Sequence, residues 1–164
     1  MMPTSQTLFL PPLAPFPNST LPVLIYPHAL KQPFGFEPLF HENGWQGIWT
    51  NGVYRFHHFH ATAHEALGVR CGWARILLGG PEGREVHVQA GDAVLLPAGT
   101  GHMLVNASGD FSVTGAYPPG QSPDLERGDL SRFDTSVAAI RQVPLPPHDP
   151  VFRNGPAERW ANLA

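Results

Sequence analysis

Short apolar runs separated by glycine dominate the middle of the chain, from residue 48 to residue 117. The runs are WTNGVYRFHHFH, EALGV, WARILLGG, REVHVQAGD, AVLLPAG, HMLVN and FSVTGAY. Short runs rich in β-branched and aromatic residues, with regularly spaced turn signals, are typical of a β-sandwich or barrel. GGPEGRE and QAGDA combine glycine with acidic residues and are predicted to be hairpin turns. The pattern therefore predicts a mainly β, antiparallel domain.

The segments on either side of this region have a different sequence pattern, with many prolines and few apolar runs. Prolines at 3, 11, 12, 15, 17 and 22 remove backbone donors, so residues 1–22 are predicted to be irregular or polyproline-like. A short strand is expected at 23–26, and short helices at 36–45 and 131–143. The tail contains at most one more short strand. We therefore divide the chain into an extension (1–47), a β core (48–117) and a C-terminal loop, helix and tail (118–164).

The composition argues against several classes of partner and of cellular location. Charged residues make up 14% of the 164 residues, the net charge is −3 and Lys31 is the only lysine. Nucleic acids and sugar phosphates require clustered Lys and Arg, so neither is an expected partner. Cys71 stands alone, which excludes an intrachain disulfide and fits a reducing compartment. The N-terminus has no basic region of a secretory signal and no run approaches 18 apolar residues, so we expect a cytoplasmic protein without a membrane span.

Four of the nine histidines lie between residues 57 and 64. If residues 52–60 are extended, Tyr54, Phe56, His58 and His60 point to one side, and Arg55, His57 and Phe59 point to the other. Two imidazoles on one side can both reach one metal ion. We therefore expect His57 to be structural and His58 and His60 to be candidate ligands.

Two further candidates follow along the chain. ATAH provides a short connection to Glu65, and His102 begins another strand after the turn PAGTG. On the face of His102 we expect Leu104 and Asn106. His64 is open to three interpretations: a ligand in place of Glu65, a residue that orients a ligand, or a cap of the turn.

The donor set indicates which ions would fit. Three imidazoles and one carboxylate suit Fe, Mn, Ni, Co, Cu or Zn, and suit Ca or Mg poorly. Four ligands on an octahedral ion leave two positions for water, substrate or dioxygen, whereas structural zinc sites are closed and usually rich in Cys. An H-x-H pair alone is more often a surface or packing feature. Among the other conspicuous residues, Cys71 is expected in a turn, and Trp45, Trp49 and Trp73 in the core.

Two motifs in the chain resemble those of the cupin superfamily. The first is Gly52, five residues, His58-x-His60, four residues, Glu65, six residues and Gly72. The second is Gly91, five residues, Pro97-x-Gly99, two residues, His102, three residues and Asn106. Over residues 36–130, NGWQGIWTNG, HEALGV and GAYPPGQSPDLERGD are similar to a group of small single-domain bacterial cupins called YjlB-like.

This resemblance implies a single-domain, jelly-roll-like antiparallel β-barrel with one or two short helices. It also implies one divalent transition metal per chain, held by His58, His60, Glu65 and His102, and a homodimer. The extension (1–47) is expected to pack on the barrel or on the dimer partner. Pocket walls are expected from Tyr54, Phe56, Leu104 and Asn106. The favoured function is a metal-dependent, oxygenase-like enzyme for a small organic molecule that chelates the ion. A non-enzymatic binding or sensing protein and a metal-free isomerase or epimerase are the alternatives.

Overall fold

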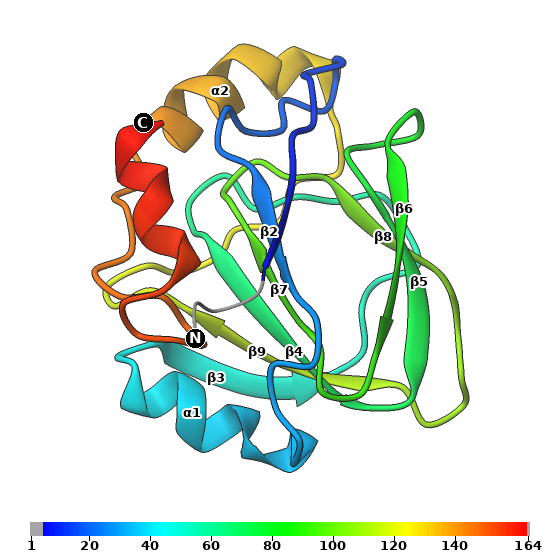
Figure 1. The fold of residues 1–164 in the computed structure, drawn as a ribbon. Coiled ribbons are helices and arrows are strands. Elements are labelled where there is room, and N and C mark those ends of the chain that lie inside the picture. Colours follow the sequence, from blue (N-terminus) through cyan, green and yellow to red (C-terminus); the bar gives the residue numbers. More distant parts are fainter. Residues whose placement is uncertain (1–4, 164) are drawn as a thin grey trace.

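The computed structural model describes residues 5–163 and contains nine strands in two antiparallel sheets (Figure 1). The strands are β1 (Gln6–Leu8), β2 (Val23–Tyr26), β3 (Gln46–Asn51), β4 (Glu65–Cys71), β5 (Trp73–Leu78), β6 (Arg84–Gln89), β7 (Ala93–Leu96), β8 (His102–Ala107) and β9 (Ser112–Tyr117). The helices are α1 (Phe36–Glu42) and α2 (Phe133–Arg141), with 3-10 helices η1 (Pro33–Gly35), η2 (Leu130–Arg132) and η3 (Pro156–Asn162). The predicted mainly β, antiparallel fold with short helices is confirmed.

The larger sheet has the order β1-β2-β7-β4-β9-β3, and the smaller sheet has the order β6-β5-β8. A hydrophobic cluster lies between the two sheets and draws side chains from both, among them Leu67, Val69, Ile76, Val88 and Val94. Burial of these side chains is what drives the sheets together. The metal-ligand candidates lie at one end of this space.

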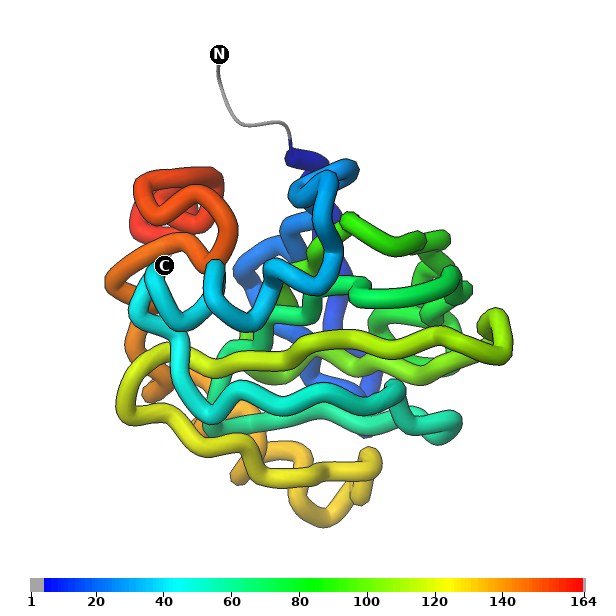
Figure 2. The backbone as a smooth tube through the Cα atoms, turned by 90° about the horizontal axis from the view of Figure 1, so that it is seen from below, coloured from blue at the N-terminus to red at the C-terminus, as the bar shows by residue number. Residues whose placement is uncertain are grey.

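The outer face of the six-stranded sheet is also covered. Phe36 and Phe40 of α1 and Trp160 of η3 pack against it and are completely or almost completely buried. Gly68 of β4 makes this possible, because a Cβ there would lie 2.3 Å from the ring of Phe36. Figures 1 and 2 show the C-terminal segment (orange to red) beside α1 (cyan) at this side of the molecule. Burial on both faces explains why β4 and β7 read as continuous apolar runs.

Several local predictions need correction. The run 49–60 is not one strand, because β3 ends at Asn51. QAGDA is not a hairpin turn: β6 and β7 belong to different sheets, so this turn carries the chain from one sheet to the other. GGPEGRE does join an antiparallel pair, β5 and β6.

The two ends of the chain also differ from expectation. Residues 6–8 form strand β1, which pairs with β2 at the edge of the larger sheet, whereas residues 1–22 were expected to be irregular. Residues 1–4 and 164 lie outside the described residues. The tail holds η3 rather than a strand. Within residues 5–163, the helices are all too short or too polar to cross a membrane.

Candidate functional site

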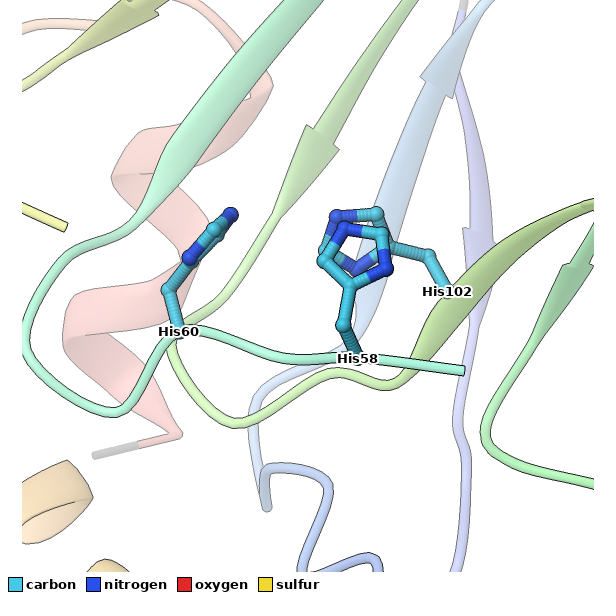
Figure 3. Close-up of side chains that lie close together, drawn as sticks. All are labelled: His58, His60 and His102. Carbon is cyan, nitrogen blue, oxygen red and sulfur yellow. The ribbon is translucent and has the colours of Figure 1, made fainter. Parts of the chain in front are cut away.

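The segment that carries His58 and His60 is extended although it is not part of a regular strand. His58 exchanges two backbone hydrogen bonds with His102, and Phe59 exchanges two with Glu126 on the other side. These bridges hold the backbone straight, so alternate side chains still share a side. His58 and His60 consequently point the same way, as Figure 3 shows, with ring centroids 5.7 Å apart.

Regular strands supply the other two candidates. Glu65 begins β4, where it shares the inner face with Leu67 and Val69 of the core between the sheets. His102 begins β8, directly across from His58. His60 Nε2 lies 3.5 Å from Glu65 Oε2, and His102 Nε2 lies 3.3 Å from Glu65 Oε1. The structure therefore brings the four predicted residues together.

The three imidazoles each offer one ring nitrogen within 4.8 Å of the others. Their Nδ1 atoms are already used: His58 Nδ1 lies 3.0 Å from the carbonyl of Phe56, and His102 Nδ1 lies 2.9 Å from the carbonyl of Thr100. His60 Nδ1 contacts the carbonyl of Asp124 in the same way. A carbonyl oxygen can only accept, so each Nδ1 must carry the proton. In the neutral rings, Nε2 then carries no proton and has a free lone pair.

Glu65 is the charged group of the cluster and is almost fully buried. Burial alone would raise the pKa of its carboxyl group, but the neighbouring His102 and His60 outweigh burial and hold that pKa well below its usual range. Burial and then the neighbouring His102 lower the pKa of His58 to about 3. Burial alone would lower the pKa of His60, but the neighbouring Glu65 carboxylate outweighs burial and raises that pKa above its usual value. The site thus combines a fixed negative charge with converging imidazole nitrogens.

This arrangement fits a divalent metal ion. With Nδ1 protonated, His102 Nε2 and Glu65 Oε1 present lone pairs to each other across 3.3 Å, and Glu65 Oε1 is buried without a hydrogen-bond donor among the described residues. Such a contact requires a positive charge between the atoms, either an extra proton or a cation. The separations of the ring nitrogens are comparable with two metal–ligand bonds of roughly 2.1 Å across one ion.

A cavity of about 570 Å³ opens onto this cluster. The lining residues are Trp49, Thr50, Asn51, Gly52, Val53, Tyr54, His58, His60, Glu65, Leu67, His102, Tyr117, Pro123, Asp124 and Leu125. Tyr54 is the predicted pocket residue that lies in this lining. Tyr117, Asp124 and Leu125 were not anticipated, and Trp49 was expected in the core. Trp49 reaches the cavity because Gly115 leaves room for it, since a Cβ there would lie 2.2 Å from the indole.

A hydrogen-bond chain leads from Trp49 to Glu65. Trp49 Nε1 donates to the Tyr117 hydroxyl at 2.8 Å, and that hydroxyl donates to Glu65 Oε2 at 3.1 Å. Burial and then the Glu65 charge raise the pKa of Tyr117, so its hydroxyl keeps its proton at neutral pH. These two hydrogen bonds hold Oε2, which also lies next to His60, and leave Oε1 facing His102.

Three residues expected in the pocket lining lie elsewhere. The Phe56 ring stacks on Tyr54 at 4.7 Å, and the Arg127 guanidinium lies 3.8 Å from the ring centroid. Leu104 is buried in the core between the sheets. Asn106 is exposed because the register of β8 against β5 shifts by one residue between Leu104 and Asn106, which reverses the alternation of faces.

His57 and His64 lie away from the cluster. His57 packs edge-on against Phe16, with ring centroids 5.6 Å apart. His64 precedes Glu65 and points to the opposite face of the sheet, where its Nδ1 accepts a hydrogen bond from Ala98 N and its ring lies against Trp160. Burial lowers the pKa of His64 to about 4. Of the three interpretations of His64, the ligand role does not fit this position.

The other conspicuous residues are distributed differently from expectation. Trp45 is buried in the core, as predicted. Trp73 is 37% exposed and stacks on His87, so its assignment to the core was wrong. Cys71 is half-buried at the end of β4, next to the turn at Gly72.

Comparison with known proteins identifies one near relative. No protein-family model matches the chain. "Uncharacterized protein YjlB" of Bacillus subtilis (strain 168) is 36% identical over 148 residues, which is 90% of each chain. A DUF861 family protein from Thermotoga maritima matches in structure with a TM-score of 0.37 and 18% identity, over 57% of this chain and 96% of its own. Acireductone dioxygenase from Bacillus anthracis, with a cadmium ion in its active centre, matches with a TM-score of 0.37 and 14% identity, over 56% of this chain and 62% of its own.

Proposed function

The chain belongs to the YjlB-like group of the cupin superfamily, and we propose that it is a metal-dependent, oxygenase-like enzyme for a small organic molecule. In this proposal His58, His60, Glu65 and His102 hold one divalent transition metal. A substrate with neighbouring oxygen atoms would be able to coordinate such an ion.

One observation carries the proposal. Three separate backbone carbonyls engage the Nδ1 atoms of His58, His60 and His102, so that the Nε2 lone pairs remain free beside a buried carboxylate. Hydrogen bonding of this kind orients metal-binding imidazoles in proteins. A purely structural cluster of histidines would not need three rings with the same tautomer facing one point.

The residues around the cluster support a reaction rather than simple storage of an ion. A bound transition metal would supply Lewis acidity or activate dioxygen. Tyr117 holds a proton inside the cavity, where its hydroxyl donates to Glu65 Oε2. Val53, Leu67 and Leu125 provide apolar walls for part of a substrate.

The first test is the metal content of the purified protein. We expect about one transition metal ion per chain after expression without a histidine tag in medium that contains Fe, Mn, Ni, Co and Zn, because the four donors require no rearrangement to meet. Elemental analysis by mass spectrometry measures the ratio. Protein that takes up none of these ions, even after incubation and removal of excess metal, would contradict the proposal.

A second prediction concerns the orientation of Glu65. Tyr117→Phe removes the hydrogen bond to Glu65 Oε2 without opening space, so the dissociation constant for the metal should rise about 10–100-fold. Trp49→Phe removes only the donor to Tyr117 and should have a smaller effect. Competition with a chromophoric chelator measures both. Wild-type metal affinity in Tyr117→Phe would show that the hydroxyl does not position the carboxylate.

A further inference from the structure

The cavity next to the candidate metal ligands is unusual in its charge. Within residues 5–163, its lining includes two acidic residues, Glu65 and Asp124, and neither lysine nor arginine. The three histidines use their Nδ1 protons on backbone carbonyls, away from the cavity. No side chain in the lining therefore offers a permanent positive charge to a ligand.

The two arginines on the neighbouring loop are held elsewhere. The guanidinium of Arg127 lies over the outer ring of the aromatic stack, 3.8 Å from the Phe56 centroid. Arg132 pairs with Glu126, with Nη2 2.8 Å from Oε1. Neither belongs to the cavity lining. Both arginines thus have partners of their own, and both are exposed to solvent.

Asp124 is fixed at the cavity wall. Its Oδ1 accepts hydrogen bonds from the backbone of Ala61 at 2.6 Å and of Thr62 at 3.2 Å, and from the Thr62 hydroxyl at 3.2 Å. These donors are neutral, and no ion pair to Asp124 is present among the described residues. Asp124 thus has no direct ion-pair partner, although His60 and the Arg132 guanidinium lie close enough to interact with its charge.

Apart from Thr50, Asn51 and Gly52, the remaining lining is aromatic and apolar. Trp49, Tyr54 and Tyr117 contribute rings, and Val53, Leu67, Pro123 and Leu125 contribute aliphatic surface. Aromatic faces attract apolar groups and cations. Away from the ion, a carboxylate or phosphate would lose part of its hydration without gaining a cationic side chain as a partner, and it would also face the charge of Asp124.

From this we infer the substrate class: the substrate carries no anionic group beyond the oxygen atoms that coordinate the ion, and the rest of it is apolar or aromatic and either uncharged or cationic. The inference rests on the proposed function, since it places the coordinating oxygens at the ion. It excludes phosphorylated sugars and any dicarboxylate whose second carboxylate does not itself coordinate the ion, because that anionic group would project into the cavity.

Three chelating probes of equal core structure test this inference. They are 4-methylcatechol (neutral), dopamine (cationic) and 3,4-dihydroxybenzoate (anionic), each titrated into metal-loaded protein by isothermal calorimetry. The association constant of each probe for the protein is divided by its association constant for the free ion, which removes differences in chelating strength between the probes. We expect the corrected affinities of the neutral and cationic probes to exceed that of the anionic probe by at least about tenfold, the size expected for one uncompensated like charge nearby.

A positive charge added to the cavity wall should reduce or reverse this preference against the anionic probe. Leu125 lines the cavity and is 48% exposed, so Leu125→Arg places a cation there without disturbing the core. Leu125→Arg should reduce the ratio of corrected affinities between the neutral or cationic probe and the anionic probe by about tenfold, or invert it. Leu125→Gln, a neutral polar control, should preserve that ratio. Metal content is measured for every sample.

The outcomes separate this inference from the proposed function. Protein that holds no metal contradicts the proposed function. Metal-loaded protein that binds 3,4-dihydroxybenzoate as tightly as 4-methylcatechol, or that binds none of the three probes, overturns the inference about the substrate and leaves the metal site intact.

Discussion

Replacement of His102 by alanine should abolish metal binding, with the dissociation constant increased by well over 100-fold. The reason is that His102 begins a regular strand and meets both His58 and Glu65, so its loss removes one donor and leaves Glu65 Oε1 without its nearest partner. Changes to residues that only orient a ligand already cost 10–100-fold, and a ligand should cost more. Elemental analysis and chelator competition on folded protein measure the effect.

His57→Ala is the matched control for this experiment. His57 lies in the same histidine cluster of the sequence but contacts Phe16 on the other side of the chain. The variant should retain about one metal ion per chain, even if it melts at a lower temperature. Equal loss of metal from His57→Ala and His102→Ala would mean that the number of histidines matters and not the side on which they lie.

The ligand cluster could be predicted because it depends on local geometry. Alternation places Tyr54, Phe56, His58 and His60 on one side, and the structure retains this row although the segment has no regular ladder. The bridges to His102 and Glu126 keep the backbone extended. The same alternation separates His64 from Glu65 on β4. Two-residue periodicity therefore survives wherever the chain is held straight from both sides.

The pocket walls could not be predicted because they depend on contacts between distant parts of the chain. Asp124 and Leu125 come from a loop that pairs with residues 58–62 through hydrogen bonds such as Thr62 Oγ1 to the Ser122 carbonyl. Trp49 and Tyr117 meet across β3 and β9. Asn106 was misplaced because one additional residue in β8 changes the face of everything after it. Apolar patterning does not show such a shift in advance.

The C-terminal tail is the part of the fold that patterning describes least well. Its 3-10 helix η3 has no strand or helix periodicity in the sequence, and prolines interrupt the preceding segment. Instead, single polar side chains attach the tail to the sheets. Trp160 Nε1 donates to the Pro22 carbonyl at 3.1 Å, and Asn43 Nδ2 donates to the Pro150 carbonyl at 2.8 Å. The most extensively bonded of these side chains is Asp149.

Asp149→Ala should therefore be strongly destabilising although it lies far from the metal-ligand candidates in sequence. The carboxylate is completely buried and accepts four hydrogen bonds, from the Tyr26 hydroxyl at 2.6 Å and from the backbone of Val151, Phe152 and Ala157 at 2.8, 3.0 and 2.8 Å. Alanine leaves all four donors buried without an acceptor, each at about 1–3 kcal/mol. We expect the free energy of unfolding in urea to fall by about 4 kcal/mol.

Two further variants divide this effect into its parts. Tyr26→Phe removes only the hydroxyl donor and should cost about 1 kcal/mol, because the carboxylate keeps its three backbone partners. Asp149→Asn preserves the shape but turns an amide NH₂ toward N–H donors, so its stability should lie between those of the wild type and Asp149→Ala. If Asp149→Ala unfolds at the same urea concentration as Tyr26→Phe, then the backbone donors find other acceptors and the carboxylate does not anchor the tail. The expected order of midpoints is wild type, Tyr26→Phe, Asp149→Asn and Asp149→Ala, since each step leaves more buried donors without an acceptor.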